Sequence, residues 1–114
     1  YLNAKKIYQN IENTKNEGTM LYSIALLQSK AKEYRGSEIS TIKAIELFKQ
    51  LDSTEVMLFN CFNNLGSVTN ALKEYDRALS FYNTALEYQK QIKKDNTYNL
   101  SILNNINYIV SCYK

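Results

Sequence analysis

Mostly apolar residues recur along the chain at alternating steps of four and three positions, the spacing that places side chains on one face of an α-helix. The clearest series are Leu58, Phe62, Leu65, Thr69 and Leu72, followed by Ala78, Tyr82, Ala85 and Gln89. Strand-like alternation is hard to find, and the chain contains no proline. The pattern therefore predicts an all-α protein.

The helical pattern repeats after 41 residues. Residues 20–51 align without a gap on residues 61–92, and a further shift places residues 104–106 on residues 63–65. The identical pairs are Lys32 and Lys73, Glu33 and Glu74, Tyr34 and Tyr75, Ala44 and Ala85, Glu46 and Glu87, Lys49 and Lys90, and Gln50 and Gln91. We expect a repeat array with the end of one unit at 1–12, units at 19–52 and 55–94, and the first helix of a further unit at 97–114.

Each unit is expected to form two antiparallel helices. The Lys-Glu-Tyr sequence at 32–34 and again at 73–75 predicts the turn between them. Ser37 and Asp76 are expected at the starts of the second helices, where cap oxygens and negative charge are favourable. The polar segments 13–18, 52–54 and 94–97 are expected to link one helix to the next.

Small residues predict where helices approach each other closely. Gly66 and Ala78 are expected where the two helices of one unit cross, and Ala85 is expected to meet the next unit. Tyr34, Tyr75 and Tyr82 fall at packing positions. The charged residues of the second helices predict a solvated outer face, formed by Glu46, Lys49, Glu87 and Lys90.

The middle unit, residues 59–92, resembles the tetratricopeptide repeat in its alternation of small and large residues. The matching residues are Leu65, Gly66, Ala78, Tyr82 and Ala85. The first unit keeps Ala44 but has Ala25, Ser37 and Thr41 at three of these places, and the third has Ile106 followed by Asn107. The resemblance implies an α-α superhelix, with a period longer than the usual 34 residues.

Lengthened units in a chain rich in Asn, Lys, Ile and Tyr are similar to those of the Rap and PlcR-like pheromone-responsive regulators of Gram-positive bacteria. This resemblance implies a cytoplasmic transcriptional regulator in quorum sensing, whose repeats bind a short peptide. Many members carry a helix-turn-helix domain that binds DNA, but no such domain is visible here. We therefore expect no nucleic-acid contact from these residues.

The tetratricopeptide resemblance also implies an inner groove lined by the first helix of each unit. The groove positions are Tyr22, Leu26 and Ser29 in the first unit, Asn60, Asn63, Ser67 and Asn70 in the second, and Ser101, Asn104, Tyr108 and Ser111 in the third. Carboxamides both donate and accept hydrogen bonds, which suits a peptide backbone. Alternatively, Asn63 and Asn104 reflect codon bias and simple exposure, and Asn64 and Asn105 are structural residues that bond across the helix pair.

Composition argues against catalysis and against a membrane span. The chain has no histidine, no glycine-rich phosphate loop and no metal-ligand set, so we expect neither an enzyme nor a cofactor. Fourteen basic against eleven acidic residues give only +3, too little to imply a nucleic-acid footprint. No apolar run approaches membrane-spanning length. Cys61 and Cys112 are interpreted as buried thiols in a reducing cytosol.

Two functions remain open. The chain is either the peptide-sensing part of a regulator or a scaffold that docks another protein or drives homodimerisation. The helical pattern is already under way at residue 1 and continues at residue 114, as expected of a piece of a longer array. Exposed apolar side chains at its ends would then favour self-association. Those residues are Ile7, Ile11, Ile106 and Val110.

Overall fold

The protein is all-α in a computed structural model that describes residues 2–92, 106 and 110. Its helices are α1 (Leu2–Lys30), α2 (Tyr34–Phe48), α3 (Glu55–Ala71) and α4 (Tyr75–Ile92). No strand occurs within these described residues. The predicted fold class is thus confirmed at the level of helical composition.

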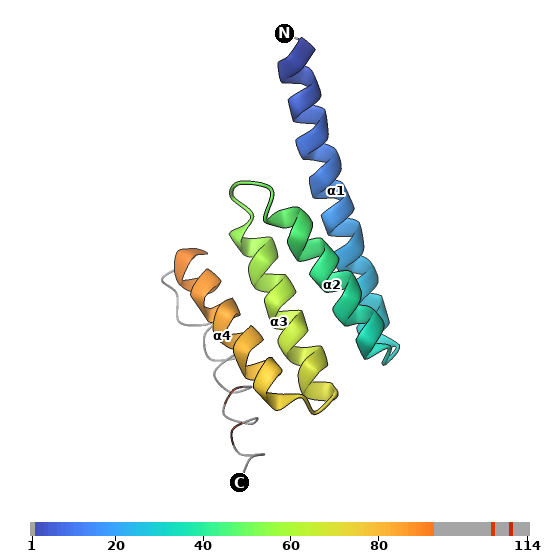
Figure 1. Cartoon of the computed structure of the whole chain (residues 1–114), viewed down its shortest axis with the longest axis vertical. Helices are drawn as coiled ribbons and strands as arrows, with labels where there is room; N and C mark the ends of the chain where they lie inside the picture. Colours follow the sequence, from blue (N-terminus) through green and yellow to red (C-terminus); the bar gives the residue numbers. More distant parts are fainter. Residues whose placement is uncertain (1, 93–105, 107–109, 111–114) are drawn as a thin grey trace. The chain divides into compact units, whose positions relative to one another are not determined.

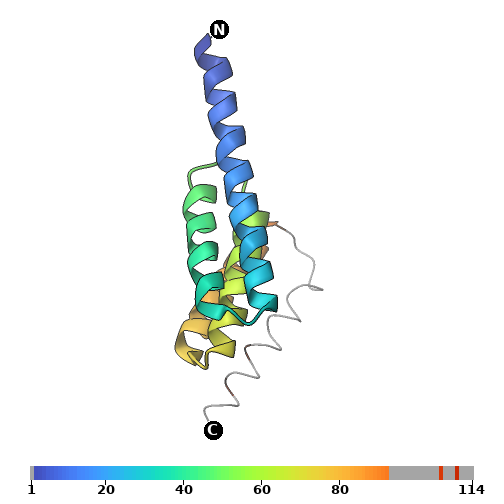
Figure 2. The same ribbon diagram turned by 90° about the vertical axis from the view of Figure 1, so that its right-hand side faces the viewer.

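The helices form two units, each an antiparallel hairpin (Figure 1). The first hairpin pairs α1 with α2, and the second pairs α3 with α4. Because α1 has 29 residues and α2 only 15, α2 lies alongside the C-terminal half of α1 (Figures 1 and 2). The N-terminal half of α1 extends beyond the end of α2.

The turns inside the two hairpins have the same backbone structure, 41 residues apart. Lys32 and Lys73 both adopt the left-handed conformation, with φ of 64° and 63°. Their amide groups donate to the carbonyls of Ser29 and Asn70 at 3.1 and 2.9 Å, respectively. The next amides, of Glu33 and Glu74, donate to Gln28 and Thr69 at 2.8 and 2.9 Å. This pair of bonds is the Schellman motif, which ends a helix by satisfying its last carbonyl groups. The Lys-Glu-Tyr prediction for both turns is confirmed.

The second helix of the first hairpin, α2, begins three residues before the predicted start at Ser37. Helix α2 starts at Tyr34, and the Glu33 side chain makes no capping hydrogen bond. The prediction of a start at Ser37 is wrong because this buried residue faces α1, where its Oγ donates to the Ala25 carbonyl at 2.8 Å. Asp76, in contrast, lies in the first turn of α4 as expected.

The predicted link at 13–18 is also wrong, because these residues lie inside α1. The lone Gly18 costs a helix only about 1 kcal/mol, which is too little to interrupt it. Thr14 and Thr19 direct their hydroxyl groups to helix carbonyls four residues earlier, at 2.8 and 2.9 Å. Residues 2–12 are therefore continuous with the first helix of the following unit. The link at 52–54 is confirmed between α2 and α3, and the one at 94–97 falls outside the described residues.

In the second hairpin, the core is built from small residues facing aromatic rings. Gly66 is buried, and a Cβ atom added there would lie only 2.6–2.8 Å from three ring atoms of Tyr82. Gly66 therefore lets the Tyr82 ring lie directly against the α3 backbone, which confirms the predicted close approach. Ala78 and Ala85 have no exposed surface. Phe62 stacks on Tyr88 with ring centres 5.6 Å apart and tilts against Phe81 at 6.3 Å.

In the first hairpin, polar contacts replace part of this aromatic packing. Ser40 of α2 donates to the Gln28 side chain of α1 at 2.7 Å, in addition to the Ser37 bond. Gly18 lies against the ring of Phe48, with hypothetical Cβ distances of 2.9–3.3 Å. The repeat-equivalent positions of Gly66 and Tyr82 are Ala25 and Thr41, both without exposed surface. Compared with the second hairpin, the first thus has a larger residue on its first helix, alanine in place of glycine. It has a smaller one on its second helix, threonine in place of tyrosine.

Candidate ligand-binding faces of the hairpins

A stripe of small polar side chains follows one face of α3. Its residues are Asn60, Asn63, Ser67 and Asn70, at steps of three, four and three. Ser67 is exposed and the three asparagines are half-buried. Because the opposite side of α3 carries core residues such as Leu65 and Val68, packing against α4 holds this stripe toward solvent.

The first hairpin presents equivalent positions on α1. Tyr22, Leu26 and Ser29 are 41 residues before Asn63, Ser67 and Asn70. Leu26 is exposed, and Tyr22 and Ser29 are half-buried. The structure thus brings the predicted groove residues of each hairpin onto one helix face. The predicted residues of the third unit, Ser101, Asn104, Tyr108 and Ser111, lie outside the described residues.

Ser67, although exposed, also interacts with Tyr82 of α4. Its side chain hydrogen-bonds Tyr82, the residue whose ring covers Gly66. Burial raises the pKa of Tyr82, and the bond from Ser67 offsets part of that rise because it favours the charged phenolate. One member of the stripe therefore also interacts with a core residue of α4.

Asn64 differs from its neighbour Asn63 because it is buried, with 8% of its surface exposed. Its burial agrees with the structural interpretation of this position. Asn63 is half-buried on the stripe, so its carboxamide remains reachable from solvent. Of the two adjacent asparagines, only Asn63 is placed as a ligand contact would require.

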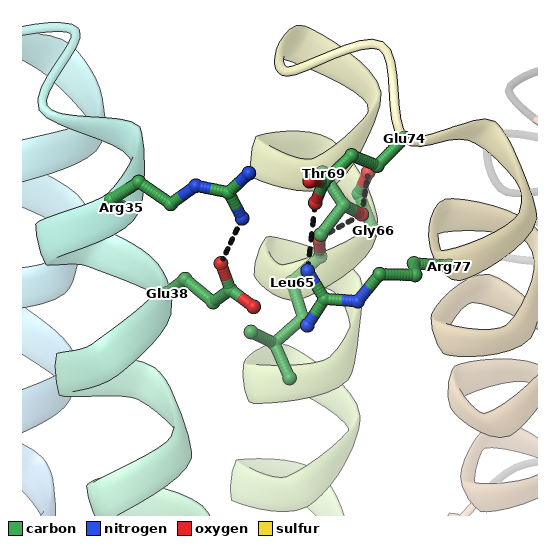
Figure 3. A network of polar contacts seen from close by, with 7 residues as sticks. All are labelled: Arg35, Glu38, Leu65, Gly66, Thr69, Glu74 and Arg77. Carbon is green, nitrogen blue, oxygen red and sulfur yellow. Dashed lines mark hydrogen bonds and ion pairs between the residues drawn. The ribbon is translucent and has the colours of Figure 1, made fainter.

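Charged side chains gather at the turns instead of the stripe. Arg77 donates to Glu74 at 2.7 Å (Figure 3). The guanidinium carbon of Arg77 also lies 5.6 Å from the centre of the Phe81 ring. Arg35 donates to Glu38, a residue with only 7% exposure, at 3.0 Å. An open cavity of about 320 Å³ at the α3–α4 turn is lined by residues 73–77. The paired charges around it make this cavity a poor candidate for a peptide groove.

Cys61 is a free cysteine in the core of the second hairpin. Cys61 has no exposed surface, and burial raises the pKa of its thiol to about 12, so it stays protonated at neutral pH. The predicted burial of Cys61 is confirmed, whereas Cys112 lies outside the described residues. Over residues 2–92, 106 and 110, no group of three or more His, Cys, Asp or Glu side chains is arranged to hold a metal ion. Among the helices described, none has the length and apolar character needed to cross a bilayer.

One buried polar residue, Gln89, continues the helix face predicted from Ala78, Tyr82 and Ala85. Gln89 is only 3% exposed, and neither its Oε1 nor its Nε2 atom has a hydrogen-bond partner among the described residues. Its repeat-equivalent residue is Phe48, which packs on Gly18.

No known protein family, curated protein or solved structure matches this chain.

Proposed function

We propose that the chain is part of a tetratricopeptide-like α-α repeat protein that binds a peptide or protein segment through the first-helix face of each hairpin. The observation that carries this proposal is the Asn60–Asn63–Ser67–Asn70 stripe, which recurs in position as Tyr22, Leu26 and Ser29. In this proposal the chain is not an enzyme and needs no cofactor. It is the peptide-sensing part of a cytoplasmic transcriptional regulator in quorum sensing, and any DNA contact belongs to another domain.

The chemistry of the stripe suits an extended, uncharged segment. A carboxamide offers a donor and an acceptor, so Asn60 and Asn63 can satisfy both groups of a peptide unit. No Lys, Arg, Asp or Glu belongs to the stripe, so charge does not select its ligand. Tyr22 and Leu26 add apolar contact area on the first hairpin. We expect binding of neutral peptides with apolar side chains, with weak dependence on salt.

The test is a binding screen of the chain against a library of short peptides, followed by isothermal titration of the best ligand. Asn60→Ala with Asn63→Ala should weaken that ligand at least about tenfold, because buried peptide groups would lose their partners. Asn83→Ala is the matched control, since Asn83 is an exposed residue of α4 outside the stripe. Capture that ignores the double substitution, or no capture at all, would remove the stripe as a peptide site.

Exposed apolar side chains of the first hairpin support the alternative of a protein-docking scaffold. Met20 and Leu27 on α1 are 63% and 66% exposed, and Ile39 on α2 is 56% exposed. Such surface area is typical of regions that another protein covers. Under this alternative, the stripe binds no short peptide. Substitution of Met20 and Leu27 would instead weaken the binding of a partner protein.

A further inference from the structure

The last turn of α4 buries a polar side chain without a partner. Gln89 is 3% exposed, and neither its Oε1 nor its Nε2 atom has a hydrogen-bond partner among the described residues. Helix α4 ends soon afterwards, at Ile92. A carboxamide both donates and accepts hydrogen bonds, and burying it without them is destabilising because it gives up its bonds to water. The closed form of this helix end is therefore unfavourable for Gln89.

The equivalent turn of α2 has an apolar residue at this position. Phe48 stands 41 residues before Gln89, has no exposed surface and lies against Gly18 of α1. Lys49 follows directly, and its amide donates to the Ile45 carbonyl at 2.9 Å. The first hairpin thus closes this end with an aromatic ring, whereas the second closes it with an unpaired amide. The destabilising burial is specific to the second hairpin.

The N-terminal half of α4, in contrast, is closely packed. Ala78 and Tyr82 are 0% and 2% exposed, and the Tyr82 ring covers Gly66 of α3. The Glu74 amide closes the preceding turn by donating to the Thr69 carbonyl at 2.9 Å. The unpaired amide of α4 therefore lies at the opposite end of the helix, where unwinding breaks the fewest backbone hydrogen bonds.

We propose that the C-terminal turn of α4, residues 88–92, opens locally while the rest of the second hairpin stays folded. Opening allows water to hydrate the Gln89 carboxamide, which relieves the burial of this group without partners. It breaks the backbone hydrogen bonds of one helical turn. It also separates Tyr88 from Phe62, whose ring centres are 5.6 Å apart in the closed form.

The opening uncovers part of the core of α3. Phe62 is 9% exposed in the closed form, where it contacts the rings of Tyr88 and Phe81. Phe81 lies before the opening turn and stays in place, so opening exposes one side of the Phe62 ring. The second hairpin therefore alternates between a form that covers this ring and a form that exposes it. This equilibrium goes beyond the proposed peptide binding, because it involves neither Asn60 nor Asn63.

The test is backbone amide hydrogen exchange, measured by NMR on the 114-residue chain without peptide. Amides of residues 89–92 should exchange at rates that change little with urea, because local opening exposes little surface. Amides of residues 78–85 should exchange faster as urea increases, since they require a larger unfolding. Gln89→Met removes the polar atoms and keeps a helix-forming side chain of similar length. It should slow exchange at 89–92 at least about tenfold, because the buried amide no longer favours opening.

The matched control is Gln91→Met, because Gln91 is an exposed residue of the same turn. This substitution should leave exchange at 89–92 within about twofold, since Gln and Met have similar helix propensities. Exchange that is unchanged or faster in Gln89→Met overturns the proposal, as does equal urea dependence at 78–85 and 89–92. A long-lived water bound to the Gln89 amide, detected by its NOE, also overturns it, because the amide would then be satisfied in the closed form. Because no peptide is present, failure here is distinct from failure of the proposed peptide site.

Discussion

At the scale of single residues, Gly66 and Tyr82 are expected to depend on each other. Gly66→Ala should destabilise the protein by about 1–2 kcal/mol, since the new methyl group would overlap the buried Tyr82 ring. The gain of about 1 kcal/mol in helix propensity offsets only part of this strain. Urea unfolding followed by circular dichroism would measure the change.

The first hairpin suggests which second substitution relieves the overlap. It has Ala25 and Thr41 at the equivalent positions, so Gly66→Ala with Tyr82→Thr reproduces that pairing. We expect the double variant to be at least about 1 kcal/mol more stable than the sum of the single effects predicts. Gly36→Ala is the control, because its methyl group would meet the end of the flexible Gln28 side chain. Simple additivity at 66 and 82 would mean that the two positions vary independently.

At the scale of elements, the two turns carry a lysine where a glycine is usual. Lys73 has φ of 63°, a conformation that costs an L-residue roughly 1–2 kcal/mol. Lys73→Gly should therefore stabilise the protein by about 0.5–1 kcal/mol, after allowance for the greater freedom of glycine in the unfolded chain. Thermal unfolding of the variant would show this as a raised midpoint.

The same substitution at Lys49 provides the control for the turn. Lys49 caps the end of α2 with φ of −67°, an ordinary right-handed conformation. Lys49→Gly should destabilise by about 0.5–1 kcal/mol, because glycine gains nothing there and loses more chain entropy on folding. Equal effects at 49 and 73 would show that backbone strain at the turn is not relieved by glycine.

Elements were predicted correctly from the sequence where local residue preferences agreed with the packing of the helices. They were predicted wrongly where a contact between helices opposed the local preference. The turns at 32–34 and 73–75 were predictable because the same three residues recur 41 positions apart. Residues 13–18 have a loop-like composition, yet they lie inside α1, where Gly18 packs against the Phe48 ring of α2. Ser37 is a good capping residue, but a tertiary bond to Ala25 engages its hydroxyl instead. In both errors a contact between helices overrode a local preference.

At the scale of the whole molecule, the candidate site was predictable in place but not in detail. The spacing of Asn60, Asn63 and Ser67 was sufficient to put them on one face of α3. The bond from Ser67 to Tyr82 depends on how α3 and α4 cross, which the sequence pattern does not specify. The unpartnered amide of Gln89 likewise appears only once its burial is known.

Global stability should fall at high pH because of Cys61. Burial raises the pKa of its thiol from 9.0 to about 12 in the folded protein, so above pH 9 the unfolded chain loses a proton that the folded chain retains. Ionisation then stabilises the unfolded state, and stability is lost as pH rises. One pH unit above the unfolded pKa, the loss is about 1.4 kcal/mol. This contribution is constant below about pH 8, where both states keep the proton.

The measurement is the free energy of unfolding in urea between pH 8 and pH 10, in a Cys112→Ser background that leaves one thiol. The variant that also carries Cys61→Ala should be less stable at pH 8, because it leaves a cavity in the core. Its stability should fall with pH less steeply, by about 1.4 kcal/mol over this interval. Tyr82 and the lysines titrate in both proteins, so their effects cancel in the comparison. Parallel pH profiles would contradict a thiol held in its neutral form by burial, and would mean that Cys61 reaches water in the folded protein.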